Sequence, residues 1–307
     1  MIIDRLIKKI QSTGAPIVVG LDPRLDQIPE YIKKAAFAEY GRTQKAVAEI
    51  FFAFNKKIID ALHDIVPAVK PQIAMYEQFG GPGLECYFHT VEYAQSKRMF
   101  VIGDVKRSDI ASTAEAYSEA HIGRPSIDGE SLEVKTANFI TLSPYMGYDN
   151  IEPYLENMKK YDKGLFVLVK TSNKSSRDIQ DVQMADGKPL YTHVGALVSE
   201  WGRPLIGKTG YSVIGAVVGA THPEEALALR KAMPHTFFLV PGYGAQGGSG
   251  KDLAGLWDGD KYGAIVNSSR GIIGAYLSDK FKCDEKEFDR AAREAALDMK
   301  DDLRAFI

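Results

Sequence analysis

Short apolar runs recur along the chain, and stretches with the helical spacing of apolar residues lie between them. The runs lack strict alternation and are rich in β-branched and aromatic residues, which is typical of parallel strands buried on both faces. They cover residues 16–22, 68–72, 100–106, 139–145, 165–172, 213–220, 237–242 and 264–269. The pattern therefore predicts eight buried strands.

Helix-like stretches separate these runs, so strands and helices alternate. The stretches cover residues 44–64, 85–96, 110–121, 151–160, 223–232, 251–256 and 285–306. Residues 1–10 add a short amphipathic helix, because Ile3, Leu6 and Ile10 fall on one face. Alternation of this kind favours an α/β fold, a closed (β/α)8 TIM barrel, over an open sheet.

The length of 307 residues suits one large barrel with extra loops. The spare residues lie in 24–42, 78–83 and 173–193, all after the carboxyl ends of predicted strands. Barrels carry their active sites on that face. No linker rich in Pro, Gly and Ser divides the chain, so we predict a single barrel domain over residues 1–307 whose loops can cover a ligand.

Composition and charge exclude several classes of partner. A formal net charge of −2 gives no electrostatic reason to expect nucleic acid or an anionic membrane. No stretch approaches the roughly 18–20 apolar residues of a membrane span, and the N-terminus does not read as a signal peptide. Cys86 and Cys283 form no CxxC or Cys/His cluster, which suits a reducing cytosol. We therefore expect a soluble cytoplasmic protein.

The most informative segment is 103–110, Gly-Asp-Val-Lys-Arg-Ser-Asp-Ile, at the end of the third predicted strand. Asp104 and Lys106 are two residues apart and so point the same way, while Asp109 falls where a helix begins. A lysine held between two carboxylates is costly for stability but useful as a proton donor or an electrostatic device. The plainer alternatives are a salt bridge on the barrel rim and an N-cap role for Asp109.

Other strand ends carry polar groups on the same predicted face. Asp22 follows the first strand, Lys70 lies in the second, and Ser172 ends the fifth. Taken one at a time, Asp22 and Lys70 have structural explanations as well. Their concurrence on one face favours a functional site there.

The last two strand ends resemble the phosphate site that many barrels build after strands seven and eight. Residues 241–248 read Pro-Gly-Tyr-Gly-Ala-Gln-Gly-Gly, and Ser269-Arg270-Gly271 ends the eighth strand. Glycines let backbone N–H groups approach an anion closely, and Arg270 supplies a planar cation. These residues predict a phosphorylated ligand, although a surface loop is the alternative.

The histidines lack metal-ligand spacing, and Ser172 and Ser269 lack a paired His and Asp, so we predict neither a metal site nor a hydrolase triad.

Residues 104–109 are similar to the DxKxxD signature of the orotidine 5′-phosphate decarboxylase family, and 104–113 resembles its type 2 bacterial subfamily. The resemblance extends from about residue 1 to 300. Type 2 sequences usually have glycine where this chain has Ser108, a change that removes no chemical group. The further matching segments are 20–24, 69–71, 143–149, 169–173, 241–248 and 269–271.

The resemblance implies loss of CO2 from orotidine 5′-monophosphate to give UMP, the last step of de novo pyrimidine (UMP) biosynthesis, without a metal or organic cofactor. It implies that Lys106 stabilises the carbanion that forms at C6 and then protonates it, beside Asp104 of the same subunit. Asp109 and Thr113 would reach the neighbouring subunit's site, so the resemblance implies a homodimer with shared active sites.

The remaining roles also rest on the resemblance. Asp22 and Lys70 would contact the ribose, and Lys70 would complete an alternating Lys-Asp-Lys-Asp chain. Ser172 would read the pyrimidine edge and Gln246 would bridge base and phosphate. The phosphate would be held by Arg270, Gly244, Gly247 and Gly248.

Three rival functions stay open from the residues. A Mg²⁺-dependent sugar-phosphate lyase or synthase on the same barrel would use Asp104 and Asp109 as metal ligands. A Schiff-base aldolase would use Lys106 or Lys170. A non-catalytic sensor of a phosphorylated ligand would need no chemistry from the charged residues.

Overall fold

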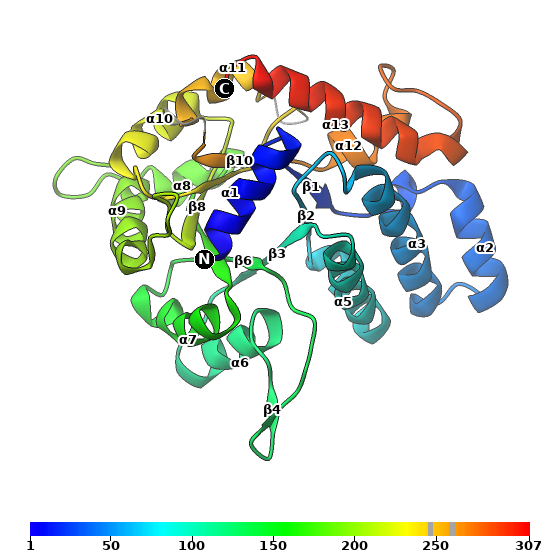
Figure 1. Ribbon diagram of the computed structural model, residues 1–307, viewed down its shortest axis with the longest axis horizontal. Coiled ribbons are helices and arrows are strands. Elements are labelled where there is room, and N and C mark those ends of the chain that lie inside the picture. The colour runs from blue at the N-terminus through cyan, green and yellow to red at the C-terminus, as the bar shows by residue number, and fades with distance from the viewer. Residues whose placement is uncertain (245–247, 258–261) are drawn as a thin grey trace.

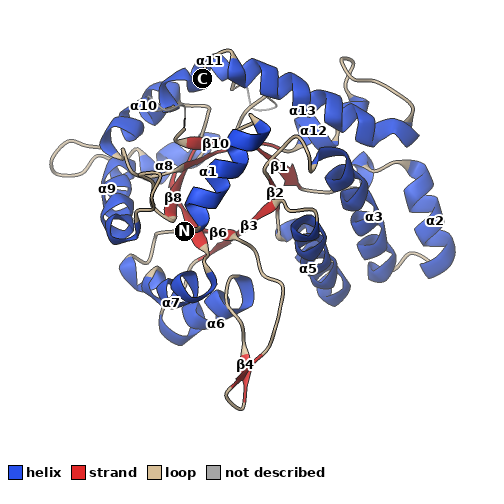
Figure 2. Ribbon diagram, viewed as in Figure 1, coloured by secondary structure: helices blue, strands red, loops and turns tan. Residues whose placement is uncertain are grey.

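Parallel strands form a closed barrel in the computed structural model of the chain, which describes residues 1–244, 248–257 and 262–307. Each strand pairs with its neighbours in the chain, and β10 pairs with β1 to close the barrel (Figure 2). The strands are β1 (Ile17–Leu21), β2 (Ala68–Pro71), β3 (Phe100–Arg107), β6 (Phe139–Leu142), β7 (Gly164–Lys170), β8 (Ile214–Val218), β9 (Phe238–Val240) and β10 (Ala264–Ser268). The predicted barrel fold is confirmed.

The strands are buried along nearly their whole length. Val18, Ile265 and Val266 have no exposed surface, and Ile17 lies in register with Val266 across the closing pair. One face of each strand packs inside the barrel and the other packs against surrounding helices. This double burial explains the continuous apolar runs.

Helices surround the barrel (Figure 1). They are α1 (Ile2–Thr13), α2 (Glu30–Tyr40), α3 (Gln44–Leu62), α4 (Ala74–Glu77), α5 (Gly80–Ser96), α6 (Ala111–His121), α7 (Glu152–Tyr161), α8 (Arg177–Gln180), α9 (Leu190–Gly202), α10 (Pro223–Ala232), α11 (Gly250–Leu253), α12 (Arg270–Ile273) and α13 (Phe288–Arg304). Single turns of 3-10 helix are η1 (Leu25–Gln27), η2 (Tyr148–Asn150), η3 (Lys174–Ser176), η4 (Arg203–Leu205), η5 (Ala254–Leu256), η6 (Ala275–Leu277) and η7 (Glu285–Glu287).

Several elements differ from the sequence prediction. Helix α5 begins at Gly80, inside the predicted loop 78–83. Helix α2 occupies much of the predicted loop 24–42, and it escapes the apolar pattern because only Ile32 is buried in it. Helix α9 is also unpredicted, because Gly195 in its interior is a poor helix former. In the structure this glycine allows close packing, since a Cβ there would lie 3.0 Å from Leu229. Strands β4 (Ser126–Ile127) and β5 (Glu130–Ser131) form a hairpin around an Asp-Gly turn, a signal that the prediction overlooked.

Helix α1 covers the amino-terminal end of the barrel, across which it lies in Figure 1. Its Asp4 accepts a hydrogen bond from the Thr209 N–H, and its Arg5 pairs with Asp162, both in segments that precede strands. The opposite end, where the parallel strands finish, is therefore the end at which the predicted site residues gather. Among the described helices, none has the length and apolar character to cross a membrane.

Candidate active site

A bulge in β3 shapes the centre of the site. Between the paired residues Gly103↔Ile140 and Arg107↔Leu142, β3 advances four positions while β6 advances two. The extra residues bring Lys106 into the left-handed region, at φ 44°. This conformation costs about 1–2 kcal/mol for a residue with a Cβ, so surrounding contacts must hold it.

The Asp104 carboxylate is the hub of the site. Its Oδ2 accepts from Lys70 Nζ at 2.7 Å and from Gln72 Nε2 at 3.0 Å. Its Oδ1 accepts from Lys106 Nζ at 2.5 Å and from Thr141 Oγ1 at 2.9 Å. Within one chain, a carboxylate thus lies between two lysines, rather than a lysine between two carboxylates as the sequence suggested.

The two lysines differ in exposure. The Lys70 side chain is 6% exposed and that of Asp104 is 9% exposed, whereas the Lys106 side chain is 46% exposed. The acidic partner of the pair is therefore buried rather than exposed on the rim. Of these two ammonium groups, that of Lys106 is the one open to a ligand.

The charges determine the protonation of the buried pair. Burial by itself would raise the pKa of the Asp104 carboxyl, but the adjacent Lys70 and Lys106 ammonium groups hold it well below its usual range. Burial would likewise lower the pKa of Lys70, but the Asp104 and Asp22 carboxylates raise it above its ordinary value. Asp104 is therefore ionised and Lys70 charged at neutral pH.

Gln72 and Thr141 belong to the site although the sequence did not single them out. Gln72 lies directly after β2 and Thr141 lies in β6, next to β3 in the barrel. Both are uncharged, and nothing in their local pattern distinguishes them from other polar residues near strand ends. Only the pairing of β3 with β2 and β6 brings them to Asp104.

Asp109 lies apart from Lys106 within the chain. Its carboxylate accepts from the Ile110 N–H at 2.9 Å, and no ion pair with Lys106 occurs among the described residues. The N-cap alternative is wrong, because α6 begins at Ala111 and Ile110 occupies the cap position. Thr113 is exposed in the first turn of α6. Among the described residues, no hydrogen bond or ion pair joins either side chain to the chain's own Asp104 cluster.

Asp22 and Ser172 lie at the same end of the barrel. Asp22 Oδ1 is buried and accepts no hydrogen bond from the described residues, so it could accept one from a ligand hydroxyl. Ser172 is half-buried just after β7, where Gly219 approaches its backbone so closely that a Cβ would meet it at 2.9 Å. The backbone of Ser172 therefore packs directly against that of Gly219 at the end of β8.

The predicted phosphate site is only partly described. Gln246 and Gly247 lie outside the described residues. Arg270 is exposed at the start of α12, directly after β10 and Ser269. The N–H groups of Gly244 and Gly248 donate to the carbonyls of Gly248 and Gly242, at 2.8 and 3.2 Å. In this conformation these two N–H groups serve the loop itself, which differs from the expectation that they face an anion.

Comparison with known proteins identifies the family. The sequence model described as "Orotidine 5'-phosphate decarboxylase / HUMPS family" matches residues 16–280. The chain belongs to this family. Orotidine 5'-phosphate decarboxylases of Clostridium tetani and Clostridium perfringens are 45% and 46% identical to it, over 99% and 100% of this chain and 98% and 99% of theirs. The OMP decarboxylase structure from Leishmania donovani matches with a TM-score of 0.74 at 29% identity, covering 99% of this chain and 98% of that one.

Ser108, which stands where the resemblance leads us to expect glycine, does not strain the backbone. The described non-glycine residues with positive φ include Lys106 and Ala111 but not Ser108. A glycine is therefore not required at that position, and the serine fits.

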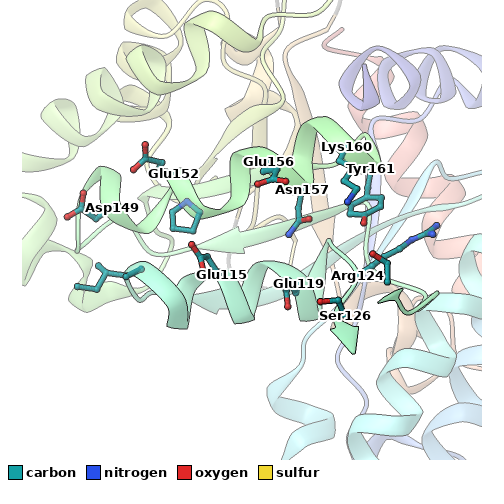
Figure 3. A pocket seen from close by; sticks show the side chains of 14 residues that line it. Glu115, Glu119, Arg124, Ser126, Asp149, Glu152, Glu156, Asn157, Lys160 and Tyr161 are labelled. Atoms are coloured by element: carbon teal, nitrogen blue, oxygen red, sulfur yellow. The ribbon is translucent and has the colours of Figure 1, made fainter. Parts of the chain in front are cut away.

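A large hollow in this family member lies away from the barrel mouth. It is an open groove of about 690 Å³ between α6 and α7 on the outer wall, and no predicted site residue lines it (Figure 3). Acidic side chains dominate it, from Glu115 and Glu119 on α6 and from Glu152 and Glu156 on α7. The Asp104 cluster, with its buried charges and the half-exposed Lys106, indicates the candidate active site better than the size of a hollow does.

The donor set around Asp104 does not resemble a metal centre. In the part of the chain that the structure describes, no three His, Cys, Asp or Glu side chains are grouped as ligands. Both Asp104 oxygens already accept two hydrogen bonds each, from Lys70, Gln72, Lys106 and Thr141. A cation recruited by Asp104 would have to displace two ammonium groups, which makes the carboxylate a poor ligand.

Proposed function

We propose that this chain converts orotidine 5′-monophosphate to UMP and CO2, the last step of UMP biosynthesis, with Lys106 as the reacting group. The observation that carries this proposal is the position of Lys106. Its ammonium is fixed on the buried Asp104 carboxylate, yet half of its side chain is open at the barrel mouth. A cation fixed in this way is suited to stabilise negative charge as it develops on a bound ligand.

The chemistry follows from that position. The C6–carboxylate bond breaks, CO2 leaves, and the bonding electron pair remains on C6. The Lys106 ammonium stabilises this carbanion and transfers a proton to C6, and water then reprotonates the lysine. Asp104 keeps Lys106 in place throughout and, being ionised, opposes the approach of a second carboxylate, which is relieved as CO2 departs.

The remote groups bind the parts of the substrate that do not react. Asp22, whose buried Oδ1 accepts no hydrogen bond within the described part of the chain, and the charged Lys70 suit the ribose hydroxyls. Ser172 suits the pyrimidine edge, and Arg270 with Gln246 and its loop suits the phosphate. Each tenfold in rate needs about 1.4 kcal/mol, so binding energy from the phosphate end must help to hold C6 against Lys106.

The ultraviolet absorbance of orotidine 5′-monophosphate tests this function directly. Purified protein should convert the spectrum of the substrate to that of UMP, with one CO2 released per UMP, at a rate unchanged in excess EDTA. A folded protein that leaves the spectrum unchanged would refute the proposal. A reaction that requires added Mg²⁺ would instead favour the metal-dependent lyase.

Replacing Arg270 with alanine should raise KM for orotidine 5′-monophosphate roughly 10- to 100-fold, because a hydrogen bond from a charged group contributes about 1.5–3 kcal/mol. Initial rates at varied substrate concentration measure the change. Arg290→Ala, which removes an exposed ion pair with Glu287 on the outer surface, should leave KM unchanged. An unchanged KM in Arg270→Ala would remove this residue from the phosphate site.

The active form that we propose is a homodimer with shared sites. Asp109 makes no ion pair with its own Lys106 in the described structure, and Thr113 is exposed beside it. A two-fold axis near this edge of the mouth would bring each Asp109 to the partner's site. The nearby exposed side chains Ile110, Tyr145 and Met146 give such an interface apolar surface.

The remaining parts of the proposal concern organisation and location. One continuous hydrophobic core joins α1, the barrel strands and α13, which supports a single domain over residues 1–307. Both cysteines are free, in keeping with a reducing cytoplasm.

Lys170 is fully buried and pairs with Asp181 and Glu225, so it is a poor candidate for the Schiff-base lysine of an aldolase.

A further inference from the structure

One side chain with no assigned role makes three hydrogen bonds to the reacting segment. Thr141 is 1% exposed in β6. Its Oγ1 accepts from the N–H groups of Val105 and Lys106, both at 3.0 Å, and donates to Asp104 Oδ1 at 2.9 Å. A hydroxyl has one donor and two acceptor positions, and all three are used here.

These hydrogen bonds fall on the bulge of β3. Where β3 carries its extra residues, the regular ladder with β6 is interrupted, and the N–H groups of Val105 and Lys106 lose their ladder partners. A buried N–H without a partner is strongly unfavourable. The Thr141 hydroxyl replaces both partners and so holds Lys106 in its left-handed conformation.

The direction of the hydroxyl hydrogen follows from the same geometry. Because both backbone groups must donate, the Thr141 hydrogen can point only to Asp104. The hydroxyl therefore fixes both ends of the Lys106–Asp104 pair, the backbone of Lys106 and the carboxylate that its ammonium contacts. A methyl group in the same place would fill the space, but it would neither accept from the backbone N–H groups nor donate to Asp104.

We propose that Thr141 is the positioning residue that aims the Lys106 ammonium at the reacting carbon. It touches no substrate atom and acts through the bulge and through Asp104. This inference rests on the proposed decarboxylation for its effect on rate. Its effect on the bulge can be measured independently of any activity.

Thr141→Val and Thr141→Ser form a matched pair. Valine keeps the shape and loses the hydroxyl, so kcat should fall about 100-fold, the size of effect expected when a catalytic group is misplaced by about 1 Å. KM should change less than about threefold, because the ribose and phosphate contacts lie on other strands. Serine retains the hydroxyl and should keep kcat within about threefold of the unaltered protein.

Thr90→Val provides the control for a general loss of stability. Thr90 is a fully buried threonine of α5 whose hydroxyl accepts from Asn55 rather than from the bulge of β3. This variant should unfold more readily and yet keep kcat. If Thr90→Val loses as much kcat as Thr141→Val, or if Thr141→Ser is as slow as valine, the positioning role is refuted.

Amide hydrogen exchange separates the inference from the proposed function. In Thr141→Val the amides of Val105 and Lys106 should exchange at least about tenfold faster, while those of β8 and β9 stay protected. Unchanged exchange would refute the role of the hydroxyl whatever the rates show. Failure of the unaltered protein to decarboxylate orotidine 5′-monophosphate would refute the proposed function alone.

Discussion

Lys106→Ala should abolish decarboxylation while leaving the protein folded. A general acid contributes roughly 10²–10⁴-fold and a preorganised charge roughly 10²–10³-fold, so the loss of both should reduce kcat by at least about 10⁴-fold. Asp104 would keep its hydrogen bonds from Lys70, Gln72 and Thr141. The free energy of unfolding should therefore change by no more than about 1 kcal/mol, as for other half-exposed ion pairs.

Single-turnover assays with orotidine 5′-monophosphate, together with urea unfolding, measure both effects. Lys97→Ala is the matched control, since Lys97 is a half-buried lysine that pairs with Asp60 shortly before β3 begins, at the amino-terminal end of the barrel. It should retain full activity. Near-normal turnover in Lys106→Ala, with folding intact, would remove Lys106 from the mechanism.

Mixing two inactive variants should restore activity. Lys106→Ala and Asp109→Ala subunits would each form inactive homodimers if every site takes Lys106 from one chain and Asp109 from the other. Random exchange makes half of the dimers mixed, each with one intact site of two, so activity should recover to about a quarter of that of the unaltered protein.

The exchange itself must be verified, for example by mass spectrometry of differently tagged subunits. A mixture that contains mixed dimers and yet shows no activity would argue against shared sites. Recovery before any exchange would point to residual activity in one of the variants. Lys106→Ala mixed with Arg270→Ala supplies the contrast at substrate concentrations well below KM. Both residues are assigned to the same subunit's site, so no fully intact site forms and mixing should not raise activity.

Much of this arrangement follows from the amino-acid sequence. The strands are buried on both faces, so their apolar runs were visible without any knowledge of partners, and parallel pairing then placed Asp22, Lys70, Asp104 and Lys106 at one end. Charged residues at the ends of the apolar runs stand out because the runs themselves carry few charges. The order of the strands in the barrel is their order in the chain, because consecutive βα units usually lie side by side.

The bulge and its partners could not be predicted in this way. The expected alternation of Asp104 and Lys106 assumed a regular strand, whereas Lys106 has a positive φ and reaches Asp104 through an irregular one. Thr141 and Gln72 are ordinary polar residues whose roles depend on the register between strands. Helix α9 was missed because a glycine that permits close packing looks like a helix breaker when its neighbour Leu229 is unknown.

Closure of the barrel by β1 and β10 has a consequence for synthesis on the ribosome. Lys70, Asp104 and Lys106 are all translated within the first 106 of the 307 residues, but β10, the strand that closes the barrel against β1, ends at Ser268. Until then β1 and the last strand made have unpaired edges that invite association with other chains. The site can therefore be complete only after β10 has been made and paired with β1. Until that point, the growing chain requires protection of the two exposed strand edges.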